Sequence, residues 1–152
     1  MSRILVVDDD ETIRDALYEL LSEEYLCHTA ETAEKAFARL EVDTYDVVLT
    51  DISMPGLSGL ELLGQVRQRF PDIPVIVISG ISDQEHAQGL IKLGAFDFLL
   101  KPFRLEVVER SVKRAVEFRK QMLKDSLANE ERADGTVQDE ASDWKIVKDG
   151  SG

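Results

Sequence analysis

The sequence predicts an α/β protein with a doubly wound, five-stranded parallel sheet and five helices. Five short apolar runs alternate with five stretches whose apolar residues recur at helical spacing. Two of the runs, Val47–Leu49 and Val75–Ile78, are continuous and rich in β-branched residues, which is typical of strands covered on both faces. Regular alternation of strands and helices favours right-handed crossovers and a parallel sheet between two layers of helices.

The predicted strands are the five apolar runs, and the predicted helices follow them. The strands cover Ile4–Val7, Tyr25–Thr29, Asp46–Thr50, Ile73–Ser79 and Phe96–Leu100. The helical stripes are Ile13, Ala16, Leu17, Leu20 and Leu21; Ala33, Ala36, Phe37 and Leu40; Leu60, Leu63, Val66 and Phe70; Ala87, Leu90 and Ile91; and Leu105, Val108, Val112, Ala115 and Val116. We expect Thr32 and Asp83 to cap helices, and Gly94 to end the fourth helix.

Composition restricts the function classes. The chain has 152 residues and a formal net charge of −12, with 30 acidic against 18 basic residues. That balance argues against direct nucleic-acid binding, which needs a basic surface to meet phosphates. The single cysteine, Cys27, excludes an internal disulfide and fits a reducing cytoplasm. The first apolar run is too short for a signal peptide or a membrane span, so a cytoplasmic location without membrane contact is expected.

The composition changes after about Leu123. Residues 124–152 hold eight acidic and four basic residues and few large apolar ones. We therefore expect one domain over residues 1–122 and a mobile acidic tail or linker over 123–152. Trp144 could instead belong to a docking motif or to the first strand of a following domain. No DNA-binding, cyclase or ATPase segment is evident after residue 122, so we expect either a stand-alone protein or a piece of a longer one.

Polar residues follow four of the predicted strands. These are Asp8, Asp9 and Asp10 after the first, Asp51 after the third, Ser79 and Gly80 at the end of the fourth, and Lys101 and Pro102 after the fifth. The carboxyl ends of parallel strands meet at one rim of the sheet, where ligands bind in such folds. The rim is therefore expected to carry a carboxylate cluster, one hydroxyl group and one ammonium group.

This combination points to phosphoryl chemistry. Carboxylates packed together repel one another and persist with a cation among them. A hard cation that keeps several waters suits Mg²⁺, with Mn²⁺ as a substitute, and Mg²⁺ neutralises transferring phosphoryl groups. A carboxylate beside the ion can become an aspartyl phosphate. Lys101 would place positive charge on the phosphoryl oxygens, and Ser79 would donate a hydrogen bond to one of them.

Four blocks, in order over about residues 1–120, resemble the receiver domain of bacterial response regulators in two-component signalling. They are Ile4–Asp10 (ILVVDDD), Asp46–Gly56 (DVVLTDISMPG), Val75–Gly80 (VIVISG) and Gly94–Phe103 (GAFDFLLKPF). Four blocks in register are a specific signal, where one alone would be weak. The resemblance implies a flavodoxin-like sheet with strand order 2-1-3-4-5.

The resemblance also implies a role for the acidic residues. Asp51 resembles the phosphoacceptor, which takes its phosphoryl group from a sensor histidine kinase or a histidine phosphotransfer protein. Asp8 and Asp9 resemble the acidic pair at the metal. Ser53 resembles the position whose backbone carbonyl joins the metal shell, so the implied metal set is Asp8, Asp9, Asp51 and Ser53.

The last two blocks resemble the parts that bind phosphate and transmit the signal. Lys101 resembles the phosphate-binding lysine, and its bond to Pro102 resembles one that is cis in the family. Ser79 resembles the switch hydroxyl, and Phe98 resembles the aromatic residue that follows it inward. That movement would remodel the surface of the fourth helix, fifth strand and fifth helix and signal to a downstream protein or fused effector.

Such a domain is not an enzyme, although it assists its own phosphorylation and slow dephosphorylation. Ser53 and Ile81 stand where the family flanks the approach of the hydrolytic water. Ser53 could at best hold a water loosely and Ile81 cannot orient one, so a long-lived phosphoryl group is expected. The stripe of the last helix runs on through Met122 and Leu123, interrupted at Arg119, and could pair two copies of the chain.

Simpler roles are expected for several residues. Asp10 fits a helix N-cap and is left out of the metal set. His28 and His86 have no second histidine or cysteine nearby, apart from Cys27 next to His28, and are expected to be surface or half-buried residues. Cys27 is expected to be buried and inert.

Two rival function classes remain. Asp8–Thr12 also fits the Asp-x-Asp-x-Thr motif of haloacid-dehalogenase-type phosphatases, with Asp8 as nucleophile and Asp10 as acid–base. That class needs a late acidic pair and a cap insertion, which the sequence lacks, and it gives Asp51 no role. A pseudo-receiver that only binds partners would need a broken site, and all the expected site residues are present.

Overall fold

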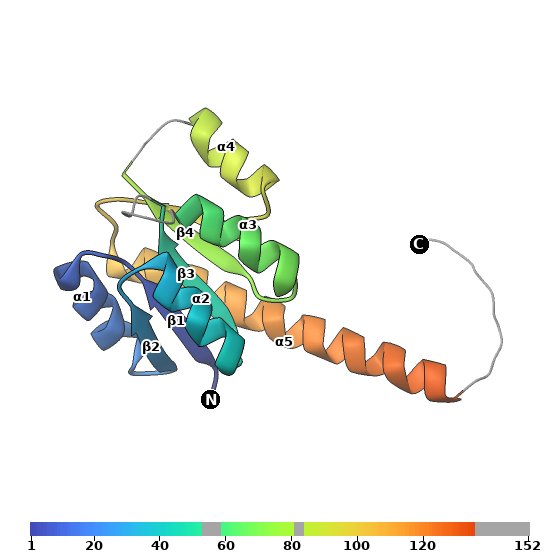
Figure 1. Ribbon diagram of the computed structural model, residues 1–152. Helices are drawn as coiled ribbons and strands as arrows, with labels where there is room; N and C mark the ends of the chain where they lie inside the picture. Colours follow the sequence, from blue (N-terminus) through green and yellow to red (C-terminus); the bar gives the residue numbers. More distant parts are fainter. Residues whose placement is uncertain (53–58, 81–83, 136–152) are drawn as a thin grey trace. The chain divides into compact units, whose positions relative to one another are not determined.

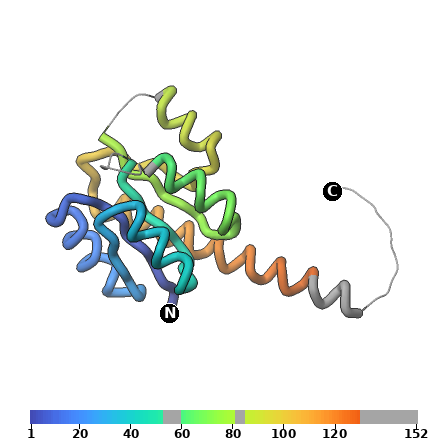
Figure 2. Tube along the Cα trace, viewed as in Figure 1, coloured from blue at the N-terminus to red at the C-terminus, as the bar shows by residue number. Residues whose placement is uncertain are grey.

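The computed structural model describes residues 1–52, 59–80 and 84–135, in which strands and helices alternate (Figures 1 and 2). The strands are β1 (Arg3–Val7), β2 (Leu26–Ala30), β3 (Val47–Asp51), β4 (Val75–Ser79) and β5 (Asp97–Leu100). The helices are α1 (Glu11–Leu21), α2 (Ala33–Val42), α3 (Gly59–Arg69), α4 (Gln84–Lys92) and α5 (Leu105–Gly135). The predicted alternation is confirmed; Ser53, Ile81, Asp83 and Trp144 lie outside the described residues.

The five strands form one parallel sheet in the order β2-β1-β3-β4-β5, as the resemblance implied. Each neighbouring pair is parallel, with Val7 opposite Thr50, Asp51 opposite Ile78 and Ser79 opposite Leu100. This register brings the carboxyl ends of β1, β3, β4 and β5 to the same edge of the sheet. It is the reason why residues far apart in the sequence meet there.

The sheet lies between two layers of helices (Figure 1). Leu5 and Val7 of β1 pack into the core shared with α2, α3 and α4. Ile4 and Val6 point to the opposite face, where α1 and α5 cover the sheet. All five residues of β3 and of β4 are buried, which explains why the two runs are continuously apolar rather than alternating. Among the described helices, none is long and apolar enough to cross a membrane.

Helix boundaries follow local hydrogen bonding. The Asp10 side chain accepts hydrogen bonds from the backbone N–H groups of Thr12 and Ile13 and so caps α1. Thr32 caps α2 in the same way by accepting from the Lys35 N–H. Gly94 follows α4 with a φ of 105°, a left-handed conformation that glycine adopts without a steric penalty. Three predicted signals are thereby confirmed.

Arg119 does not interrupt the apolar stripe of α5 in the way the sequence suggested. The stripe of Val108, Val112, Ala115 and Val116 is buried, and Arg119 continues it with only 8% of its surface exposed. Its guanidinium donates to the backbone carbonyl of Asp72 at 3.2 Å and its Nε lies 3.6 Å from Asp46 Oδ1. The aliphatic stem can therefore extend the core-facing stripe while the charge is met at the amino end of the sheet.

Two compact units divide the chain between Arg119 and Lys120, close to the predicted boundary at residue 122. The α5 helix crosses this boundary and ends at Gly135. The predicted mobility of the tail from residue 123 stays a prediction. Residues 120–134 contain no proline or glycine and are rich in Lys, Glu, Leu and Ala, which favour helix without any core.

Gly94 provides a test of the turn between α4 and β5. An alanine at this position would have to adopt a positive φ, and its Cβ atom would lie 2.9 Å from Arg67 Nε. We expect Gly94→Ala to lower the free energy of unfolding by about 1–2 kcal/mol, measured by urea denaturation. Gly89→Ala is the matched control, because nothing lies within 4 Å of its added Cβ in α4. The control should be neutral or up to about 1 kcal/mol more stable; equal losses in both variants would contradict the role of the turn.

Candidate functional site

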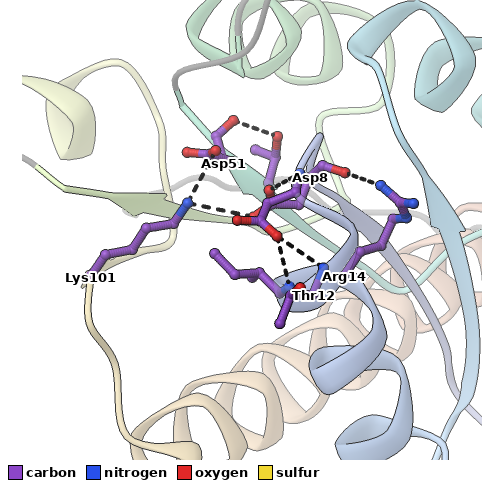
Figure 3. Close-up of polar contacts among 8 residues, drawn as sticks. Asp8, Thr12, Arg14, Asp51 and Lys101 are labelled. Atoms are coloured by element: carbon purple, nitrogen blue, oxygen red, sulfur yellow. Dashed lines mark hydrogen bonds and ion pairs between the residues drawn. The ribbon is translucent and has the colours of Figure 1, made fainter.

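The structure brings Asp8, Asp51 and Lys101 together at the carboxyl edge of the sheet (Figure 3). The Lys101 Nζ lies 3.2 Å from Asp51 Oδ2 and 3.7 Å from Asp8 Oδ2. One carboxylate oxygen from each of Asp8, Asp9 and Asp51 lies within 4.8 Å of the other two. The rim therefore holds three neighbouring carboxylates, and two of them lie beside the Lys101 ammonium group.

Asp51 is the last residue of β3 and is held by a fully buried strand. Its own exposed fraction is 5%, so its carboxylate reaches the rim without being freely solvated. The Thr50 hydroxyl donates to the Asp51 backbone carbonyl at 3.0 Å. The backbone N–H of Ile52 donates to the carbonyl of Ile78 at 2.9 Å, which ties the residue after Asp51 to β4. These bonds fix the backbone, so the Asp51 carboxylate is presented in a defined place.

Asp8 is the more deeply buried carboxylate, with no exposed surface. Its Oδ1 accepts the backbone N–H of Asp10 at 2.9 Å, and its backbone carbonyl accepts Nη1 of Arg14 at 2.9 Å (Figure 3). Its Oδ2 has no hydrogen-bond partner. Burial raises the pKa of Asp8 above its usual value, and the Asp10 N–H and the charge of Lys101 oppose that rise only in part.

Asp8 Oδ2, which has no hydrogen bond, and the neighbouring carboxylates fit a hard divalent cation. Oxygens bound to one Mg²⁺ at about 2.1 Å lie within about 4.2 Å of one another, so only small side-chain movements separate the cluster from an ion-binding arrangement. Asp8 and Asp51 are buried, whereas Asp9 is exposed and leaves one side open to water. Mg²⁺ characteristically keeps several waters, which this half-open donor set permits. The donor set therefore fits the metal that the sequence predicted.

The structure separates Asp10 from the cluster. Asp10 Oδ1 accepts two backbone N–H groups of α1, from Thr12 at 2.9 Å and from Ile13 at 3.3 Å. A side chain engaged in this way caps the helix rather than binding a metal. It is equally unsuited to the acid–base role that the phosphatase interpretation required, because its carboxylate is committed to the end of the helix.

Lys101 and Ser79 come from the ends of adjacent strands. The Lys101 backbone N–H donates to the Ser79 carbonyl at 2.8 Å, which extends the pairing of β5 with β4 to the rim. The Lys101–Pro102 peptide bond is cis, as the resemblance implied. Ser79 is completely buried, and Phe98 of β5 packs, partly buried, against the core shared with α2, α3 and α4. Ser53, which the resemblance places in the metal shell, lies outside the described residues.

Sequence reasoning gave no role to either histidine. His28 Nδ1 lies 2.8 Å from the Tyr45 hydroxyl, so this histidine is a half-buried partner of a core tyrosine. His86 is different, because its Nε2 lies 3.5 Å from the Ser79 hydroxyl. No sequence signal indicated that contact, since it depends on how α4 packs against the end of β4. Cys27 is buried, as predicted, and burial raises the pKa of its thiol to about 12, which disfavours the reactive thiolate.

The buried charge of Asp8 leads to a stability prediction. A carboxyl whose pKa is raised by folding stabilises the protein while protonated, below about pH 4, and that contribution is lost as the pH rises through the folded-state pKa. In metal-free protein at pH 7, Asp8→Asn should therefore raise the thermal midpoint by about 2–5 °C. The advantage should shrink as the pH falls toward about 4.

Differential scanning calorimetry with a chelator present measures this effect. Asp15→Asn, on the exposed face of α1, is the matched control and should change little. A lower midpoint for Asp8→Asn at neutral pH would show that the Asp8 charge is already balanced without a metal.

The comparisons with known proteins identify the family. The model of the response regulator receiver domain matches residues 4–113. The DNA-binding transcriptional regulator NtrC of Salmonella typhimurium is 43% identical over 114 residues, which cover 74% of this chain and 24% of that protein. The C4-dicarboxylate transport transcriptional regulatory protein DctD of Pseudomonas aeruginosa is 38% identical over 123 residues, covering 80% of this chain and 27% of that protein.

Solved structures agree with this result. The receiver domain of NtrX from Brucella abortus is 38% identical, with a TM-score of 0.71, and the match covers 75% of this chain and 98% of that chain. A response regulator receiver domain protein from Clostridium thermocellum is 32% identical, with a TM-score of 0.74, covering 81% and 99%. The chain spans about a quarter of the length of the full regulators NtrC and DctD. Its fold, its family-model match and these relatives together show that the chain belongs to the response regulator receiver family.

Proposed function

We propose that Asp51 accepts a phosphoryl group from the phosphohistidine of a sensor kinase or phosphotransfer protein, in a reaction that depends on Mg²⁺. The observation that carries the proposal is the position of Asp51, a buried carboxylate 3.2 Å from the Lys101 ammonium and beside Asp8 and Asp9. An Asp51 oxygen would form the new bond to phosphorus. The phosphorus–nitrogen bond would break, and its electron pair would return to the imidazole of the donor.

Other residues at the rim would bind the metal ion and the phosphoryl oxygens. Asp8, Asp9 and Asp51 would hold Mg²⁺, together with the Ser53 carbonyl that the resemblance implies. The ion, or Mn²⁺ in its place, would supply positive charge to the phosphoryl oxygens. Lys101 would bind another of these oxygens, since its Nζ already lies between Asp51 and Asp8. This leaves positioning and charge neutralisation as the main catalytic contributions, which is usual for phosphoryl transfer. The domain would thus assist its own phosphorylation without being an enzyme.

An open pocket next to Lys101 could form part of the binding surface for the phosphoryl donor. It encloses about 430 Å³ and is lined mainly by apolar groups of α1 and of the segment after β5. Its lining residues are Thr12, Ile13, Ala16, Lys101, Pro102 and Phe103. A donor protein that contacts this surface would bring its phosphohistidine to the rim beside Asp51. We therefore place the kinase or phosphotransfer protein on this face.

Phosphorylation would change the surface formed by α4, β5 and α5, and a partner would recognise that change. Ser79 would move toward the phosphoryl group and Phe98 would follow it inward, which changes the surface near both residues. Leu100 and Leu105 on this side are exposed apolar residues that a partner could cover. A downstream protein, a fused effector such as those of the longer regulators, or a second copy pairing through α5 would read this change. The receiver itself would act in the cytoplasm and need no contact with nucleic acid.

Phosphorylation of Asp51 is tested with acetyl phosphate and Mg²⁺, followed by mass spectrometry. The wild-type chain should gain one phosphoryl group, and Asp51→Asn should gain none, because the nucleophilic carboxylate is gone. Asp43→Asn is the matched control, since this exposed acid precedes β3 at the opposite edge of the sheet. A phosphoryl group on Asp51→Asn, mapped by proteolysis to Asp8, would instead support the phosphatase interpretation.

Substitutions of Asp9 and Asp10 should differ in their effects on Mg²⁺ affinity and on stability. Asp9→Ala should weaken Mg²⁺ binding by about tenfold, which corresponds to about 1.4 kcal/mol, because a charged ligand is lost. Asp10→Ala should leave the Mg²⁺ affinity within about twofold but lower the stability by about 1 kcal/mol through loss of the α1 cap.

Calorimetric titration or Mn²⁺ relaxation measures the affinity, and urea denaturation measures the stability. Tryptophan fluorescence is unsuitable because the only tryptophan is Trp144, far from the site in sequence. Equal loss of metal affinity in both variants would place Asp10 among the ligands.

A further inference from the structure

His86 touches both residues of the proposed switch. It lies in the first turn of α4, and its Nε2 is 3.5 Å from the Ser79 hydroxyl at the end of β4. Its ring also meets the ring of Phe98 edge-on, with the centroids 6.1 Å apart and the planes at 79°. One side chain of α4 therefore contacts the hydroxyl group and the aromatic ring that are expected to move together.

The contact with His86 limits which other hydrogen bond the Ser79 hydroxyl can donate. A serine hydroxyl carries one proton and can donate only one strong hydrogen bond at a time. If Ser79 donates to His86 Nε2, the same proton is not available to a phosphoryl oxygen on Asp51. Because Ser79 is completely buried, its hydroxyl rotates among partners supplied by the protein rather than by bulk water. Binding to His86 and binding to the phosphoryl group therefore compete.

We propose that His86 is a positioning residue that holds the Ser79 hydroxyl in the unphosphorylated protein and releases it when Asp51 carries a phosphoryl group. This inference rests on the proposed function of Asp51. In it, the His86 ring carries its proton on Nδ1, and Nε2 accepts a hydrogen bond from the Ser79 hydroxyl. The edge contact with Phe98 keeps the ring in place, so both halves of the switch are restrained by α4 until the hydroxyl turns away.

The length of the contact sets the size of the effect. Hydroxyl hydrogen bonds are most often 2.7–2.8 Å long, so a bond of 3.5 Å is weak. A weak restraint suits a reversible switch, because a phosphoryl oxygen can displace it. Losing it should tighten the binding of a phosphoryl mimic by about threefold rather than by orders of magnitude.

The test measures the affinity for beryllofluoride, a phosphoryl mimic, by ¹⁹F NMR with Mg²⁺ present. His86→Phe keeps an aromatic ring against Phe98 but removes the acceptor, and it should bind beryllofluoride about threefold more tightly than wild type. His86→Gln restores a polar group near the Nε2 position and should return the affinity toward the wild-type value. Gln88→Ala, an exposed change on the same helix, is the matched control and should leave the affinity unchanged.

A double-mutant cycle with Ser79→Ala separates the hydroxyl from packing effects. In the Ser79→Ala background, His86→Phe should no longer change the affinity, because the competition has already been removed. The same gain in both backgrounds would overturn the proposal and assign the effect to packing against Phe98. No gain in the wild-type background would also overturn it.

A second measurement needs no variant of His86. The ¹⁵N resonance of His86 Nε2 should shift when beryllofluoride is added to the wild-type protein and should shift less in Ser79→Ala. An Nε2 resonance that responds equally in both proteins would contradict the proposal. Failure of the proposed function is distinguishable, because beryllofluoride would then not bind the wild-type chain in a way that depends on Asp51.

Discussion

Burial of Asp8 and Asp51 beside one ammonium group is the constraint on which the rest of the site depends. Both carboxylates are almost completely removed from solvent, and Lys101 is close to both of them. Burial disfavours the charged form of a carboxyl group, and Asp8 shows this as a raised pKa. Lys101 offsets only part of the negative charge. The folded domain therefore concentrates negative charge at a place that suits a divalent cation of the kind we propose.

The parallel sheet determines where the charged side chains of the site lie relative to one another. Asp8, Asp51, Ser79 and Lys101 each come from a different strand, and the strand register brings their strand ends to one edge. Backbone hydrogen bonds, such as the one from Lys101 N–H to the Ser79 carbonyl, hold these positions. The helices on both faces keep water away from the strands. The preorganisation of charge thus comes from the most buried part of the fold.

Those same buried strands explain what the sequence could predict. The β-branched runs and the Asp10 cap have local causes, so the strands were found with ends mostly within two residues of those observed, and Asp10 was assigned correctly. Arg119 was misread because its charge is met by Asp46 and Asp72, more than forty residues away. The apolar stripe predicts the last helix only as far as Leu123, whereas α5 ends at Gly135, because helix propensity can act without a core. His86 was missed because its contact with Ser79 depends on tertiary packing.

The contact between His86 and Ser79 also bears on how a small change at the rim can reach a surface helix. The Ser79 backbone is fixed by its pairing with Leu100 and by its carbonyl bond to Lys101. The side-chain rotation of its hydroxyl is therefore the freedom that remains at this residue. A rotating hydroxyl can have discrete partners, and two that matter for the proposed switch are His86 of α4 and a phosphoryl oxygen on Asp51. Since a single weak hydrogen bond separates such states by little free energy, charge at Asp51 can shift their populations without disturbing the sheet.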